Sequence, residues 1–127
     1  MPEQHLFEYA VIRVVPRVER EEFINVGVIL YCAKQKFLQV IILINERKLL
    51  GFAPDLEIDV IRENLQAIVN ICKGESLGGP IGKLDMVSRF RWLTATRSTV
   101  VQASKVHPGF CKDAEATLKK LAEQLVF

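Results

Sequence analysis

Residues 7–32 constrain the fold more than any other part of this chain. Two apolar runs rich in β-branched side chains, residues 9–15 and 24–32, flank a short connection. Runs of this length and composition predict neighbouring strands in the core of a sheet. A connection that only turns the chain is usually built from Gly, Asn and Ser. This one instead carries five ionisable residues: Arg17, Glu19, Arg20, Glu21 and Glu22. It is therefore the first candidate for a functional site.

The first half of the chain predicts three strands, over residues 7–15, 23–32 and 37–44. The first has apolar residues on both alternating faces, as expected for a strand that is covered on both sides. The second and third are joined by residues 33–36, a polar connection short enough for a hairpin. Residues 40–44 have the β-branched density of a buried central strand.

Two amphipathic helices are predicted with clear ends. The first begins after Pro54, and its apolar residues recur at three- and four-residue steps: Ile58, Ile61, Leu65, Ile68 and Cys72. Lys73 and Gly74 match the basic last turn and the glycine that commonly end a helix. The second helix covers residues 113–126, where Asp113 is placed to cap the N-terminus.

The stretch between these helices is less regular. Residues 74–82 are rich in glycine and are interpreted as an internal loop. Residues 83–93 fit either a short helix or an extended segment, and residues 99–103 fit a further strand. The order βββ-α-(α)-β-α predicts a single α+β domain over residues 1–127. We expect an antiparallel sheet of about four strands with the helices packed on one face.

Composition excludes several classes of protein. The 127 residues are 50% hydrophobic and 25% charged, which is globular rather than disordered composition. The net charge of +2 lacks the basic excess of a dedicated nucleic-acid binder. Three cysteines match no zinc pattern, and an odd number argues against a disulfide framework. We expect two of them, Cys32 and Cys72, to be buried as small apolar residues. The sequence shows no signal peptide or membrane-spanning run, so we expect a soluble cytoplasmic protein.

The charged connection has two interpretations. Arg13, Arg17 and Arg20 are able to converge on a phosphate or carboxylate, because guanidinium groups bind such anions with two hydrogen bonds. Nearby glutamates, Glu19 among them, would then act as acids, bases or cation ligands. The interpretation we favour is a solvated hairpin whose opposite charges pair with each other. Arg13 differs because it lies inside an apolar run, and we expect it to anchor a buried or half-buried ion pair with a nearby glutamate.

Asn25 and Gly27 interrupt the start of the second apolar run. Glycine inside a strand often marks a bulge or the close approach of another backbone. Asn25 is able either to present its amide to a ligand or to satisfy backbone groups at such a bulge. We favour the structural role for both residues.

A third candidate site is the Arg-Phe-Arg-Trp sequence at residues 89–92. If it is extended, the two arginines share one face and the two aromatic rings share the other. Basic residues interleaved with aromatic ones suit a nucleic-acid backbone and its bases, and Arg and Trp are equally typical of protein interfaces. A structural alternative places Trp92 in the core and pairs the arginines with the glutamates of the charged connection. Further polar residues follow: Arg97, Ser98, Thr99, Gln102, Ser104 and His107.

The chain carries no recognised catalytic signature. It has no P-loop, dinucleotide-binding or HExxH sequence. Pairing His107 with Ser104 or Cys111 requires a geometry that proximity in sequence does not supply. We therefore expect no catalytic residue, no metal and no cofactor, and an enzyme would have to work through Glu and Arg alone.

These segments resemble an uncharacterised bacterial family, the domain-of-unknown-function family 3037 (DUF3037). The resemblance rests on YAVIRVVPRVEREEFINVGVILY, RFRWLTATRSTVVQASKVHPG and the C-terminal helix, and covers most of the chain. It implies no known reaction or ligand. Such proteins are similar to ones encoded beside a HipA-like kinase, which implies a small regulatory partner. The family's motif positions fall on Arg13, Pro16, Arg17, Glu19, Arg20, Asn25, Gly27, Arg89, Trp92, Arg97, Ser98, Gln102, Ser104 and His107.

The sequence leaves three hypotheses open. The leading one is a non-enzymatic interaction or regulatory module that binds a protein partner, with a HipA-like kinase as the candidate. The alternative is a phosphate- or nucleic-acid-binding protein, or a nuclease-like enzyme with an arginine and glutamate site. In the third, residues 7–15 lie beside residues 99–103, and the two motifs form one internal polar network. Each hypothesis allows a homo-oligomer and none requires a membrane. The residues expected to contact a ligand or partner are Arg13, Arg17, Glu19, Arg20, Asn25, Arg89, Arg91, Trp92, Arg97, Ser98, Gln102, Ser104 and His107.

Overall fold

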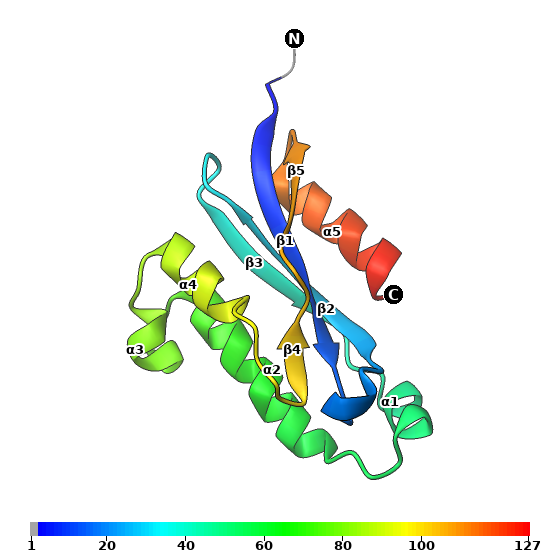
Figure 1. Cartoon of the computed structure of the whole chain (residues 1–127). Helices are drawn as coiled ribbons and strands as arrows, with labels where there is room; N and C mark the ends of the chain where they lie inside the picture. Colours follow the sequence, from blue (N-terminus) through cyan, green and yellow to red (C-terminus); the bar gives the residue numbers. More distant parts are fainter. Residues whose placement is uncertain (1–2) are drawn as a thin grey trace.

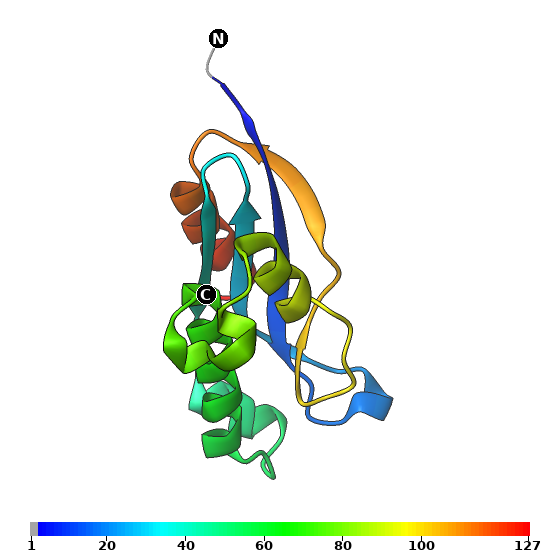
Figure 2. The same cartoon turned by 90° about the vertical axis from the view of Figure 1, so that its left-hand side faces the viewer.

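An antiparallel sheet of five strands forms the centre of the computed structural model, which describes residues 3–127 (Figure 1). β1 (His5–Val14), β2 (Ile24–Cys32) and β3 (Phe37–Ile42) lie side by side in chain order. On its other side β1 pairs with two short strands, β5 (His107–Cys111) along its first half and β4 (Val101–Ala103) along its second. The sheet therefore has one edge formed by β3 and one shared by β4 and β5 (Figure 2).

The β2–β3 hairpin closes through residues 33–36, as their polar sequence predicts. The N–H of Lys36 donates to the carbonyl of Ala33, and Cys32 pairs with Phe37. The side chain of Gln35 then ties this turn to the start of the C-terminal helix. Its amide donates to the carbonyl of Lys112 and accepts from the N–H of Ala114, each at 2.8 Å.

Three of the helices begin at a side-chain cap. Asn45, Asp85 and Asp113 each accept a hydrogen bond from the backbone N–H three residues further along, which satisfies one of the free donors of a helix N-terminus. The helices are α1 (Glu46–Phe52), α2 (Ile58–Lys73), α3 (Gly79–Gly82), α4 (Met86–Leu93) and α5 (Ala114–Leu125), with short 3-10 turns η1 (Val18–Arg20) and η2 (Ser76–Gly78).

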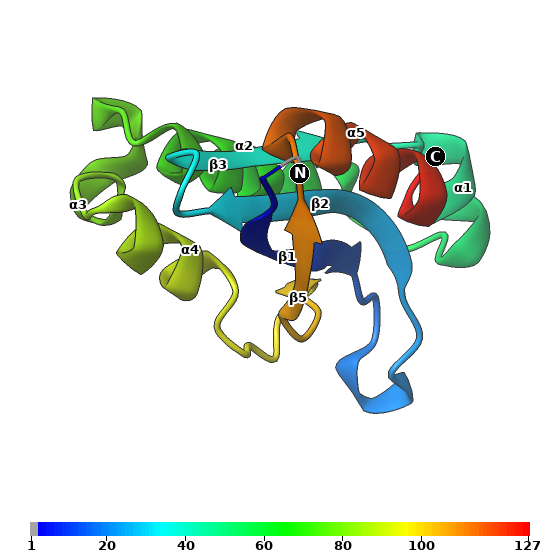
Figure 3. The same ribbon diagram turned by 90° about the horizontal axis from the view of Figure 1, so that it is seen from above.

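The helices divide between the two faces of the sheet. On one face, Leu65 of α2 and Phe90 of α4 are buried in a cluster with Ile12 of β1. On the opposite face, Leu118 of α5 is buried against Val28 of β2. Figure 3 shows α4 and α5 on opposite sides of β1 and β2. The expectation of helices on one face thus holds for α2 and α4 but not for α5.

The α+β class, the three N-terminal strands and both amphipathic helices are confirmed. The expectation of a buried central strand over residues 40–44 is wrong, because β3 lies at an edge of the sheet and its residues 40–42 are only partly buried. Gly74 ends α2 in the left-handed conformation with φ of 73°, and Asp113 caps α5. The predicted neighbourhood of residues 7–15 and 99–103 is also confirmed, since β1 pairs with β4. Cys32 and Cys72 are buried and free, as expected.

Four segments differ from the expectation or go beyond it. Residues 74–82, interpreted as a loop, contain the turn η2 and the short helix α3. Residues 83–93, which fitted two conformations, contain the helix α4. The helix α1 was not predicted, and neither was the strand β5, whose His-Pro-Gly sequence is typical of a turn.

Candidate functional site

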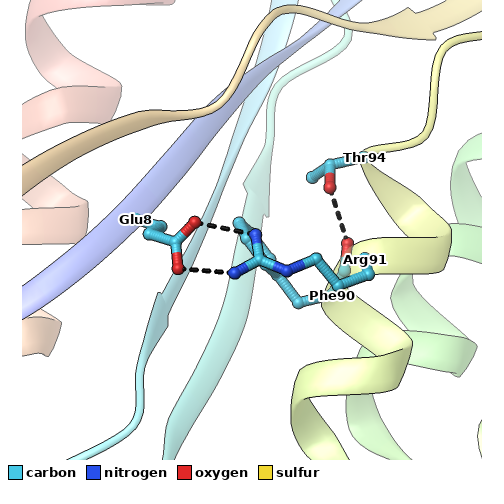
Figure 4. Close-up of polar contacts among 4 residues, drawn as sticks. All are labelled: Glu8, Phe90, Arg91 and Thr94. Atoms are coloured by element: carbon cyan, nitrogen blue, oxygen red, sulfur yellow. Dashed lines mark hydrogen bonds and ion pairs between the residues drawn. The ribbon is translucent and has the colours of Figure 1, made fainter.

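The arginines of α4 do not share a surface, because residues two apart on a helix point in different directions. Arg91 reaches back to the sheet, where its two terminal nitrogens donate to the carboxylate of Glu8 at 2.7 and 2.8 Å (Figure 4). Hydrogen bonding to Arg91 lowers the pKa of Glu8. The neighbouring Phe90 stacks on Tyr31 of β2 with 5.4 Å between the ring centres. The ion pair and the stacked rings therefore both join α4 to the sheet. The acid that pairs with Arg91 is Glu8, not a glutamate of the charged connection.

Arg89 binds the end of another helix. Its guanidinium group donates to the carbonyls of Ile71 at 3.2 Å and Cys72 at 2.8 Å, and also to that of Leu84 at 3.0 Å. Carbonyls in the last turn of a helix lack partners within the helix and attract positive charge. Gly74 lies against this contact, since a Cβ there would come within 2.6 Å of an Arg89 nitrogen. Arg89 is thus a cap for α2.

Arg97 caps α4 in the same manner. It donates to the carbonyls of Trp92 at 2.6 Å and Leu93 at 3.5 Å. Its guanidinium carbon also lies 4.3 Å from the centre of the Trp92 ring, a cation–π contact. Trp92 is 41% exposed and so lies outside the core. Ser98, which follows, is exposed.

A cleft of about 460 Å³ lies between the charged connection and the loop from α1 to α2. The Nε of Arg20 lies 2.5 Å from a carboxylate oxygen of Glu22, and a terminal nitrogen of Arg17 lies 3.9 Å from a carboxylate oxygen of Asp55. All four side chains are at least half exposed, and exposed pairs of this kind contribute less than about 1 kcal/mol each. Glu19 is exposed in η1. The geometry agrees with a solvated hairpin. The cleft is lined by Pro16, Arg17, Arg20, Glu22, Gly51, Phe52, Ala53, Pro54 and Asp55.

Arg13 lies near the end of β1, and its direct neighbours in the sheet are Asn25 on β2 and Gln102 on β4. Directly paired residues of antiparallel strands present their side chains on the same face. Asn25, Arg13 and Gln102 therefore form a polar row across three strands, which we call the Arg13 row. Tyr9 belongs to the cluster under α5 and alternates with Arg13 along β1, so the row lies on the α5 face.

Arg13 differs from the other half-buried arginines in lacking a polar partner. Arg89 and Arg97 donate to carbonyls, whereas in residues 3–127 Arg13 has no ion pair and its buried Nε has no hydrogen bond. Its guanidinium carbon lies 3.8 Å from the centre of the Phe23 ring. Burial lowers the pKa of Arg13. The expected ion pair does not form, because the strand places amides beside Arg13 and the nearby glutamates lie beyond its end.

Asn25 and Gly27 lie at an irregularity of the β1–β2 ladder. The register shifts between Ile12 and Arg13, so Ile12 pairs with Gly27 and Arg13 with Asn25. A Cβ on Gly27 would come within 2.7 Å of the carbonyl oxygen of Ile41, which agrees with the predicted bulge and close backbone approach. The Asn25 amide donates to the carbonyl of Leu125 at the end of α5, and its buried Oδ1 has no partner in residues 3–127.

The remaining polar candidates of β4 and β5 have mainly local contacts. Gln102 donates to the carbonyl of Thr99 at 2.7 Å. Ser104 is buried, and its hydroxyl accepts from the N–H of Val11 and donates to the carbonyl of Lys105. It therefore bridges the interruption between β4 and β5. His107 is exposed, with its ring centre 5.3 Å from that of Tyr9.

Of the expected site residues, the structure brings Arg13, Asn25 and Gln102 together and keeps the α4 arginines apart from them. Sequence reasoning missed two residues that decide these roles, Glu8 and Phe23. The signal for Glu8 was its place in a strand otherwise rich in apolar residues. The contact of Phe23 with Arg13 depends on the register of β1 and β2, which the sequence does not display.

Within residues 3–127, no group of three or more His, Cys, Asp or Glu side chains is placed to hold a metal ion. None of the described helices is both long and apolar enough to cross a membrane. The comparisons with known proteins give one match. A family model described as "Protein of unknown function (DUF3037)" matches residues 9–126. No curated protein and no solved structure matches the chain.

Proposed function

This chain belongs to the DUF3037 family, and we propose that it is a non-enzymatic interaction module that binds a protein partner through the Arg13 row. The observation that carries the proposal is the unpaired Arg13. A half-buried charge without a polar partner costs free energy. A carboxylate supplied by a partner would remove that cost, because it offers two acceptors to the guanidinium fork.

The surroundings of Arg13 suit a protein partner. Phe23 is 44% exposed beneath the guanidinium group, and a fixed arginine beside an exposed aromatic ring is typical of interface residues that dominate binding. The row thus offers one cation beside an apolar surface.

The candidate partner is the HipA-like kinase that the family resemblance implies. The test is co-expression with that kinase, followed by size-exclusion chromatography at micromolar concentration. We expect a stoichiometric complex with the wild-type protein and its loss in Arg13→Met, which keeps the apolar stem and removes the charge. Arg47→Met is the matched control, since Arg47 is exposed on α1 and is not part of the row. An unchanged complex with Arg13→Met, or no complex with the wild type, would overturn the proposal.

A second candidate function is binding of phosphate or nucleic acid at the cleft beside the charged connection. The favouring observation is that Arg17 and Arg20 line this cleft and are both 63% exposed. Binding of DNA, RNA or nucleotides should then fall steeply as salt rises, because bound phosphates release counterions. Arg17→Ala with Arg20→Ala should abolish it. Absent or salt-insensitive binding would remove this candidate.

A further inference from the structure

The two edges of the sheet differ in how well they are protected. The edge formed by β4 and β5 is interrupted at residues 104–106 and contains Pro108, which has no N–H to donate. The β3 edge is six residues long, contains no proline, and is followed by no further strand in residues 3–127. An uninterrupted apolar edge of this kind is a template for another strand.

The ladder shows which backbone groups of β3 are free. The N–H of Leu43 donates to the carbonyl of Val26, and hydrogen-bonded pairs of an antiparallel ladder recur every second residue. Phe37, Gln39 and Ile41 therefore bond inward to β2. The residues between them, Leu38, Val40 and Ile42, direct their N–H and C=O groups outward. The edge thus presents three outward-facing residues.

A groove runs along the first half of this edge. It has a volume of about 460 Å³ and lies between β3, the end of α2 and the start of α4. Its apolar lining includes Val40, Val69 and Met86, and its charged lining holds Lys36, Lys73 and Arg89 against Glu75 alone. The groove therefore combines apolar walls with an excess of positive charge.

We propose that an extended segment of a partner protein adds to the sheet as a strand beside β3. Its backbone pairs with Leu38, Val40 and Ile42, its alternate apolar side chains enter the groove, and an acidic side chain meets Lys36 or Lys73. In strand addition, backbone hydrogen bonds supply affinity and pockets for alternate side chains supply specificity. The inference rests on the proposed function, since the segment belongs to a partner protein.

A second copy of this chain fits the groove less well. The side chains of Leu38, Val40 and Ile42 on this face are already part of the protein's own core cluster. A copy that paired through its own β3 would therefore have no free side chains to place in the groove. It would also bring no acidic residue of β3, because residues 37–42 contain none. Both observations favour a separate extended segment.

The test begins with a phage-displayed library of random short peptides, selected on the full-length protein. We expect enrichment of peptides that alternate apolar and polar positions and carry acidic residues. A synthetic copy of an enriched peptide is then bound to the wild-type protein for hydrogen exchange. The amides of Leu38, Val40 and Ile42 should become protected. Enrichment of no peptide, or protection of residues 107–111 instead, would overturn the proposal.

Variants then test the two parts of the contact. Val40→Pro removes an outward N–H without breaking the β2–β3 ladder, and it should weaken peptide binding about tenfold. Lys36→Glu with Lys73→Glu should weaken it to a similar extent, whereas Lys120→Glu on α5 should have no effect. Unchanged binding by Val40→Pro would contradict the proposal. So would a wild-type dimer that Val40→Pro makes monomeric, because a second copy would then occupy the edge.

The same variants separate this inference from the proposed function. A kinase complex that is lost in Arg13→Met but unaffected by Val40→Pro, with no peptide selected, would overturn strand addition alone. Failure of the wild-type protein to form the kinase complex would overturn the proposed function, whichever peptides were selected.

Discussion

Arginines of similar burial have different roles in this protein. Arg89 and Arg97 direct their guanidinium groups at carbonyls of helix ends, where positive charge is favourable. Arg13 is held over an aromatic ring, and within residues 3–127 it has no ion pair and its buried Nε has no hydrogen bond. The first two stabilise the fold, whereas the unmet hydrogen bond of the Arg13 Nε costs free energy. This difference is why we assign binding to Arg13.

Arg89→Met should destabilise the protein by about 2 kcal/mol, because hydrogen bonds from a charged group to the carbonyls at the end of α2 are lost. Urea unfolding followed by circular dichroism measures the change. Arg47→Met, on an exposed arginine of α1, is the control and should be neutral. If Arg89→Met were equally neutral, the cap on α2 would have no energetic role.

Glu8→Gln should lower stability at neutral pH by about 1 kcal/mol, as the bidentate pair with Arg91 is lost. The pKa of Glu8 is lowered in the folded protein from its ordinary value of 4.5. Its contribution is therefore fully present above pH 4.5 and is lost as the pH falls through the lower folded pKa. The stability difference between wild type and variant should shrink below that pH. A difference independent of pH between 3 and 7, roughly the range over which a carboxylate titrates, would show that the pair is not responsible.

Site residues that break a local sequence pattern could be predicted, whereas residues whose roles depend on distant partners could not. Arg13 stood out because a charged residue in an apolar strand is unusual, and Gly27 because a strand glycine indicates close approach. The roles of Arg89, Arg91 and Arg97 did not follow, because their partners are backbone carbonyls and Glu8, a residue more than eighty positions away from Arg91. Long-range partners of this type leave no local pattern in a sequence.

At the scale of elements, strands with alternating apolar residues were predictable and β5 was not. Pro108 and Gly109 are typical of turns, yet Pro108 is tolerated because β5 is an edge strand. Gly109 allows the ring of Phe7 to lie directly over the strand, since a Cβ there would come within 2.6 Å of that ring. The stabilising contact comes from β1, so the local sequence does not reveal it. The helix α1 was missed because it is short and buries only Leu49.

Gly109→Ala should therefore destabilise the protein by about 1–3 kcal/mol, the usual cost of overpacking. Hydrogen exchange should become faster at residues 5–9, which pair with β5. Gly51→Ala in α1 is the matched control, because no atom lies within 4 Å of its added Cβ and alanine favours a helix by about 0.5 kcal/mol. Equal effects of the two substitutions would contradict the contact with Phe7.

At the scale of the whole molecule, the sheet separates two apolar clusters and contributes side chains to both. One cluster lies under α2 and α4, and the other lies under α5. The two-sided apolar pattern of residues 7–15 indicated this arrangement more clearly than the helix patterns did. An amphipathic stripe shows that a helix is packed, but it does not say on which face of a sheet. The position of α5 is fixed by contacts such as Gln35 with Ala114, which are 79 residues apart.

The cysteines report on the integrity of both clusters. Cys72 lies in one and Cys32 and Cys111 in the other, and all three are free and buried. Burial raises the pKa of Cys72 to about 12 and also raises that of Cys111. A thiol reagent at neutral pH should therefore label the protein only as it unfolds in urea, with labelling and circular dichroism changing together. Rapid labelling of any thiol in the native protein would disprove this packing.

The measurement that tests the central claim most directly compares the free energies of unfolding of Arg13→Met and Arg89→Met in urea. Both substitutions remove a half-buried arginine charge and keep an apolar stem of similar length. If Arg13 has no partner within the protein, Arg13→Met should be as stable as the wild type or more stable, while Arg89→Met loses about 2 kcal/mol. An equal loss in both variants would mean that Arg13 serves the fold, and the Arg13 row would no longer be a binding site.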